Sequence, residues 1–131
     1  MKNRMNKFRV FVFLAGAMSL SVAVAAERKD GLSEDRALDV LLDRIHHDHL
    51  YDSHLPQCLH YYAEDTTDKY VEFAIREKHD GKKCKGAIEV EPIVDRFRID
   101  RHSQVITWFD VANDRYEPYQ RVFKDRGLVT P

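Results

Sequence analysis

The sequence predicts an α+β fold, in which one N-terminal helix packs on a four-stranded antiparallel sheet after a cleaved signal peptide. Three observations lead to this prediction. An uncharged segment follows the basic residues at the N-terminus, one later stretch has apolar residues at helical spacing, and two further stretches alternate apolar and polar residues around a polar turn. Helical spacing marks one buried stripe and alternation marks one buried sheet face. Packing the stripe on that face gives a two-layer domain.

The N-terminal segment has the layout of a secretory signal peptide. Four basic residues precede an uncharged run, Val10 to Ala26, that ends in small residues. The alternative is a membrane anchor, because a run of about 17 residues lies at the short limit for crossing a bilayer. We expect cleavage, with a signal peptide over residues 1–25 and a single domain over residues 26–131. The predicted location is therefore periplasmic or secreted, with no stable membrane anchor after cleavage.

The charge of the mature chain is acidic. Removing residues 1–25 takes away four basic residues and no acidic ones, so the net charge changes from -1 to about -5. Nucleic-acid binding depends mainly on basic patches, so the composition argues against nucleic acid as a partner. The remaining chain of about 105 residues suffices for one domain with a modest core.

The two cysteines, Cys58 and Cys84, both lie in the mature part of the chain. In an oxidising compartment they predict a disulfide, with two free thiols as the alternative. The sequence has no Cys-x-x-Cys or zinc-type spacing, which argues against redox catalysis and a thiolate metal site.

The predicted helix covers residues 34–51. Ser33 and the acidic residues after it suit a helix start, because the hydroxyl caps free amides and acids favour the positive end of the dipole. The apolar stripe consists of Leu38, Leu41, Leu42 and Ile45. Pro56 ends the segment, since the residue before proline avoids helical geometry.

The predicted strands form two hairpins. The first joins residues 57–64 to 70–79, and the second lies within residues 93–110. A loop over residues 80–87 separates them and carries Cys84. The pattern weakens in residues 111–123, where Pro118 suits an edge or crossing segment, and residues 124–131 are expected to fray.

The segment Arg98 to Ile106, RIDRHSQVI, resembles the strand, Asp-x-x-Thr-Gly turn and strand of PepSY domains. Ser103 and Gln104 stand where that pattern has Thr and Gly. The layout as a whole is similar to small helix-on-sheet modules of exported proteins, of the PepSY and cystatin-like kinds. The resemblance implies a non-catalytic module that regulates or inhibits another exported protein.

The polar face of the sheet is the predicted binding site. The last strand is apolar on both sides, so either Ile106 and Trp108 or Val105 and Phe109 must share the polar face, and we take the first pair. Arginine with aromatic residues is typical of protein-binding hot spots. The predicted protein-binding residues are Glu72, Arg76, Arg96, Arg98, Ile106 and Trp108.

What covers this face is left open by the sequence. The partner would be another exported protein, or a second copy of the chain in a homodimer. Alternatively, the C-terminal segment, with Tyr116, Tyr119 and Phe123, folds back over the second apolar row.

Five of the seven histidines lie between residues 46 and 60. His46 and His49 are three residues apart near a helix end, and Asp52 or His54 in the following turn would complete a zinc or copper site, for which we take His54. Two alternatives remain: ordinary surface histidines that favour the helix dipole, and pH sensing.

The sequence does not predict an enzyme, because it lacks a Gly-x-Ser-x-Gly, a His-Glu-x-x-His and a phosphate-binding glycine loop. The predicted function is a non-enzymatic periplasmic or secreted protein-binding module without a cofactor. An inhibitor or an immunity protein acting on another exported protein would fit. The alternative is a periplasmic metal-binding protein that uses the histidine cluster.

Overall fold

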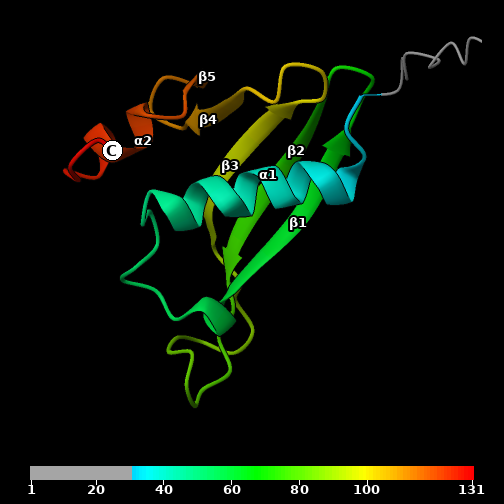
Figure 1. Ribbon diagram of the computed structural model, residues 1–131. Coiled ribbons are helices and arrows are strands. Elements are labelled where there is room, and N and C mark those ends of the chain that lie inside the picture. Colours follow the sequence, from blue (N-terminus) through cyan, green and yellow to red (C-terminus); the bar gives the residue numbers. More distant parts are fainter. Residues whose placement is uncertain (1–30) are drawn as a thin grey trace, which may run out of the picture.

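A computed structural model describes residues 31–131 (Figure 1). The predicted signal peptide, residues 1–25, lies outside the described residues. In order, the elements are α1 (Glu34–His47), the short 3-10 helix η1 (Pro56–Cys58), β1 (Leu59–Thr66), β2 (Tyr70–Glu77), β3 (Ile93–Asp100), β4 (Ile106–Asp110), β5 (Arg115–Pro118) and α2 (Arg121–Asp125). This arrangement confirms the α+β class. Within residues 31–131, no helix combines the length and the apolar character needed to cross a membrane.

The sheet is an antiparallel meander with the strand order β1-β2-β3-β4-β5. The prediction of four strands was wrong by one, because the weakly patterned tail supplies β5. Asp110 stabilises the turn before it: its carboxylate accepts hydrogen bonds from the Asn113 backbone N–H at 3.1 Å and from the Asn113 amide at 2.6 Å. Pro118 ends this edge strand, a position where a missing N–H costs no ladder bond.

Helix α1 begins as predicted and ends four residues earlier than predicted. The Ser33 side chain accepts a hydrogen bond from the Arg36 backbone N–H at 3.3 Å. The backbone leaves the helix at Asp48, and His49 adopts a positive φ of 57°. Side chains beyond residue 47 therefore do not continue the helical faces that the spacing predicted.

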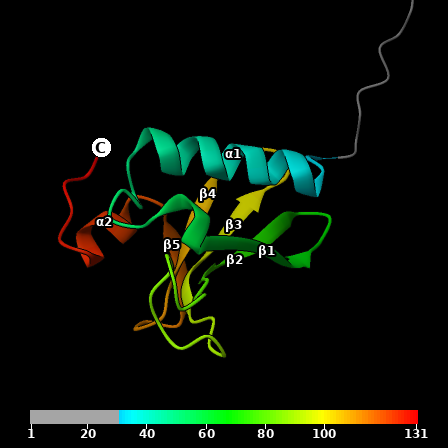
Figure 2. The ribbon, with the colours of Figure 1, turned by 90° about the horizontal axis from the view of Figure 1, so that it is seen from below.

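The core lies between α1 and one face of the sheet. Figure 2, seen from below the view of Figure 1, shows α1 lying along that face. The buried residues from α1 are Ala37, Leu41 and Ile45; the central strands add Val71, Phe73, Ile75, Phe97 and Ile99; the tail adds Tyr119, Val122 and Phe123. The C-terminal segment therefore completes the core on the side of the sheet that faces α1. The opposite face of the sheet is not covered by α1.

The placement of Trp108 on the polar face was wrong. Trp108 pairs with Phe97 across β3 and β4 and is only 6% exposed, on the side of the sheet that faces α1. Its indole N–H donates to the buried Asp95 carboxylate at 2.8 Å. The Tyr51 hydroxyl and the Arg126 guanidinium donate to the same carboxylate. These three hydrogen bonds to Asp95, which we call the Asp95 hub, connect β3 and β4 to the turn after α1 and to the end of α2.

The predicted disulfide between Cys58 and Cys84 is confirmed. It joins η1 to the loop between β2 and β3, and it closes a loop with a sequence separation of 26 residues. In the chain-entropy model a loop of this size contributes about 3.5 kcal/mol to stability. The Asp80 carboxylate fixes the same loop by accepting from the Lys82 and Cys84 backbone N–H groups, each at 2.9 Å.

Candidate protein-binding face

The face of the sheet opposite α1 carries a row of charged and aromatic side chains, which we call the open face. Its members follow from the strand register, which sets Glu72 beside Arg98 and places Ala74 between Tyr62 and Arg96. The open face consists of His60, Tyr62, Glu64, Asp65, Tyr70, Glu72, Arg76, Arg96, Arg98, Thr107, Phe109 and Tyr116.

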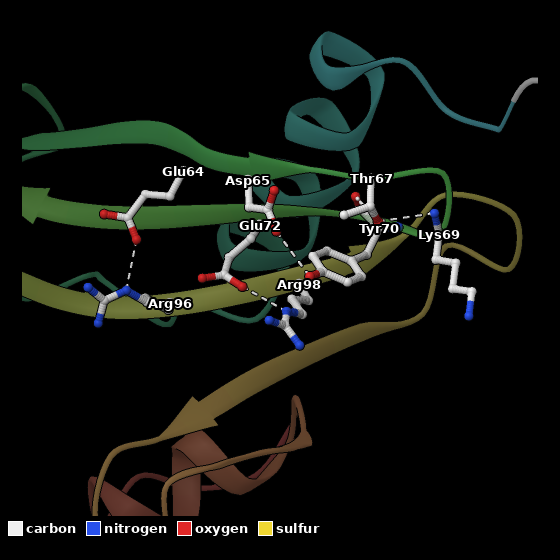
Figure 3. A network of polar contacts seen from close by, with 8 residues as sticks. All are labelled: Glu64, Asp65, Thr67, Lys69, Tyr70, Glu72, Arg96 and Arg98. Carbon is white, nitrogen blue, oxygen red and sulfur yellow. Dashed lines mark hydrogen bonds and ion pairs between the residues drawn. The ribbon is translucent and has the colours of Figure 1, made fainter.

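Arg98 lies at the centre of this face and is held on three sides. Its Nε donates to the Glu72 carboxylate at 2.7 Å (Figure 3). Its guanidinium carbon lies 4.2 Å from the ring centroid of Tyr70 and 3.9 Å from that of Tyr116. Cation–π contact and a charge-assisted hydrogen bond fix this guanidinium in one orientation. The side chain nevertheless remains 35% exposed.

The two tyrosines that flank Arg98 are themselves anchored to acids. The Tyr70 hydroxyl donates to Asp65 at 3.0 Å, and this hydrogen bond is the main reason that the pKa of Tyr70 is raised. The pKa of Tyr116 is raised as well, first by burial and then by the neighbouring Glu72 carboxylate. Both hydroxyls therefore stay protonated at neutral pH and keep their donor role.

A second ionic group occupies the β1 side of the open face. Glu64 accepts from Arg96 Nε at 2.8 Å and from an Arg76 terminal nitrogen at 3.1 Å. The hydrogen bond from Arg96 is the largest cause that lowers the pKa of Glu64, against the opposing effect of burial. Beside this group lies a hollow of about 440 Å³ lined by Tyr62, Glu64, Arg76 and Glu91.

The charges on the open face nearly balance, because its three arginines face the acidic Glu64, Asp65 and Glu72. Its arginines are engaged by neighbouring acids or rings and hold defined positions. Such a face offers rigid aromatic and guanidinium groups at low entropic cost. It does not offer a strong field of one sign that would attract a highly charged partner.

Four of the six predicted binding residues share this face: Glu72, Arg76, Arg96 and Arg98. Trp108 and Ile106 do not. Ile106 pairs with Ile99 and packs half-buried against the core, so the outward row of β4 is the alternate one, with Thr107 and Phe109. The sequence showed that one apolar row had to face outward, and the wrong row was chosen because the acceptor for the indole N–H lies on another strand.

Sequence reasoning missed Tyr62 and Tyr70 on this face, and it named Tyr116 only in the alternative in which the C-terminal segment covers the second apolar row. The alternation in β2 places Tyr70 on the same side as Glu72, so that signal was present. The role of Tyr116 depends on its pairing with Phe109 across β4 and β5. It could not be inferred without knowing that β5 exists.

The three predicted metal-binding histidines do not form a common site in the described structure. His49 pairs with Asp52 at 3.0 Å, whereas His54 lies 3.4 Å from Glu77 at the far end of β2. Within residues 31–131 no group of three or more His, Cys, Asp or Glu side chains could hold a metal ion. Because α1 ends at His47, His46 and His49 do not share a helical face. Zinc or copper binding stays a prediction.

Comparison with known proteins returned no match: no protein-family model, no curated protein and no solved structure is similar to this chain. The resemblance of the β3–β4 turn to PepSY domains, and of the layout to cystatin-like modules, therefore stays a prediction.

Proposed function

We propose that this protein is a non-enzymatic module that binds another exported protein through the open face. The observation that carries the proposal is Arg98, stacked between Tyr70 and Tyr116 and fixed by Glu72 on a face that α1 does not cover. Arginine and tyrosine are the residues enriched where protein interfaces concentrate their binding energy. Fixing them in advance reduces the entropy lost on binding.

The proposed location is periplasmic or secreted. The basic and then uncharged N-terminal sequence supports export, and a disulfide is typical of chains that fold in an oxidising compartment. An inhibitor or an immunity protein falls within this class, and the PepSY-like turn favours a regulatory role. A second copy of the chain is the other candidate partner for the same face.

The test is affinity capture from the exported proteins of the producing cells, with the mature, oxidised chain as bait. Arg98→Ala removes the stacked guanidinium while Tyr70 and Tyr116 stay in place. Arg36→Ala is the matched control, because Arg36 lies on the exposed side of α1 and, among residues 31–131, forms an ion pair with Asp39 alone. The proposal expects one partner to be retained by wild type and Arg36→Ala and to be lost, by at least about tenfold, with Arg98→Ala.

Equal recovery of every captured protein by Arg98→Ala and by wild type would contradict the proposal. Thermal unfolding of both variants must accompany the capture, so that loss of the fold is distinguished from loss of the contact. Light scattering of the purified chain identifies the homodimer, whose dissociation by Arg98→Ala would assign the open face to a second copy.

A further inference from the structure

The loop between β2 and β3, residues 78–92, lies with η1 at one end of the molecule (Figure 1). The Cys58–Cys84 disulfide joins the two segments. Three large apolar side chains are more than half exposed at this end: Leu55, Ile88 and Val90. A single exposed apolar residue is ordinary, whereas several that lie close together indicate a binding surface.

Lysines gather around these apolar side chains. Four of the six lysines in residues 31–131 fall between positions 78 and 85. Lys83 and Lys85 line a hollow of about 220 Å³ together with Leu55. Ile88 packs beside Gly81 in the same loop, where a Cβ added to the glycine would lie 3.1 Å from Ile88 Cδ1. We give the name disulfide tip to the exposed side chains at this end: Leu55, Lys82, Lys83, Lys85, Ile88 and Val90.

The three lysines of the disulfide tip are not paired with carboxylates: among residues 31–131, none of them forms an ion pair. The nearby acids have other contacts. Glu77 lies 3.2 Å from His79, and Asp80 accepts from backbone N–H groups of its own loop. Glu91 lines the hollow beside the open face. Glu89 is exposed at this end and opposes the lysines, which outnumber it.

The composition of the disulfide tip favours a lipid surface over a protein partner. Protein interfaces are enriched in aromatic residues and arginine and depleted in lysine, whereas the disulfide tip has lysine and neither of the others. Lysine suits a bilayer surface, since its hydrocarbon stem lies along apolar groups while its ammonium group attracts lipid phosphates. The mature chain is acidic overall, so an anionic surface attracts this end and repels the rest of the molecule.

We propose that the disulfide tip adsorbs reversibly to the surface of an anionic lipid bilayer. The apolar side chains of Leu55, Ile88 and Val90 enter the headgroup region, and the three lysines lie beside the lipid phosphates. This contact is peripheral and uses none of the residues that hold Arg98 on the open face.

The test is co-sedimentation of the mature, oxidised chain with vesicles of phosphatidylglycerol and phosphatidylcholine, in parallel with vesicles of phosphatidylcholine alone. We expect binding to the anionic vesicles, its loss at high salt, and no binding to the neutral ones. Lys83→Glu weakens binding by at least about tenfold, because one lysine near an anionic surface contributes about fivefold and the new carboxylate is repelled. Ile88→Ser weakens it by at least about threefold.

Two substitutions at the opposite end of the sheet are the matched controls. Lys69→Glu and Val105→Ser make the same kinds of change at exposed positions in the β1–β2 and β3–β4 turns, and each should alter vesicle binding by less than about twofold. Glu89→Lys removes the opposing charge and should strengthen binding by about fivefold. All of these positions are exposed, and thermal unfolding of each variant checks that the fold is intact.

No binding to anionic vesicles, equal binding to neutral ones, or equal losses in Lys69→Glu and Lys83→Glu would overturn the proposal. Soluble polyglutamate bound as tightly as the vesicles would assign the tip to an acidic protein and overturn it as well. Arg98→Ala should bind vesicles as wild type does, and its failure to bind would place the lipid contact on the open face instead.

Discussion

The Asp95 carboxylate is the common hydrogen-bond acceptor for three side chains around it. This carboxylate is buried on the α1 side of β3 and accepts from Trp108, Tyr51 and Arg126. A buried carboxylate needs a positive partner and hydrogen bonds to offset its desolvation. The sequence gives no sign that Asp95 and Arg126, 31 residues apart, would meet. The Asp95 carboxylate accepts from the indole N–H, so Trp108 can lie on the buried side of the sheet with its polar group satisfied.

Replacement of Asp95 by asparagine tests this hub. Asp95→Asn keeps the shape but removes the charge that Arg126 needs, so we expect the free energy of unfolding to fall by about 3 kcal/mol. Asp52→Asn is the control, because Asp52 is exposed beside His49 and should change stability by less than about 0.5 kcal/mol. Chemical denaturation of both variants gives the comparison. Equal stability of the two would show that the Asp95 contacts contribute nothing.

Glu64 on the open face makes the stability of the protein depend on pH. Its pKa is lowered from the ordinary 4.5, first by the hydrogen bond from Arg96. A lowered pKa in the folded state stabilises the protein above the unfolded value, and this contribution is lost as the pH falls through the folded value. We therefore expect the unfolding temperature to fall as the pH drops below about 4.5, the ordinary pKa of the Glu64 carboxyl. In Glu64→Gln we expect a lower unfolding temperature at neutral pH and a smaller decrease on acidification. The same decrease in both proteins would contradict this assignment.

At the scale of elements, the C-terminal segment departs most from the sequence-based expectation. Residues 111–123 lack a clear period because β5 has only four residues and α2 only five, too few for a repeat to emerge. Their apolar residues nevertheless fill the core: Phe123 stacks edge to face on Tyr119, with ring centroids 5.6 Å apart. By contrast, α1 and the first four strands have several repeats of their pattern, which made them predictable.

Truncation of a tail side chain tests whether this segment is part of the core. Phe123→Ala removes a fully buried ring, so we expect a loss of about 3 to 5 kcal/mol in the free energy of unfolding. Val129→Ala, at a position that is 92% exposed, should have no measurable effect. Urea denaturation distinguishes these results, and a loss below about 1 kcal/mol for Phe123→Ala would mean that the tail does not pack as described.

For the molecule as a whole, the sequence predicted the helix-on-sheet architecture, the Cys58–Cys84 disulfide and four residues of the open face. Strand alternation alone placed Glu72, Arg76, Arg96 and Arg98 together, because that pattern fixes faces locally. The other residues of the open face that contact these arginines could not be inferred in the same way. Glu64 lies next to an irregularity in the register of β1, and Tyr116 belongs to the fifth strand.

The open face is the proposed binding site for a partner protein. A photoreactive phenylalanine in place of Tyr62, which is 42% exposed on that face, reports on it directly. The same probe in place of Arg36 on α1 reports on the opposite side. With the captured partner present, irradiation should cross-link the chain through position 62 and not through position 36. Cross-linking through position 36 alone would contradict the claim.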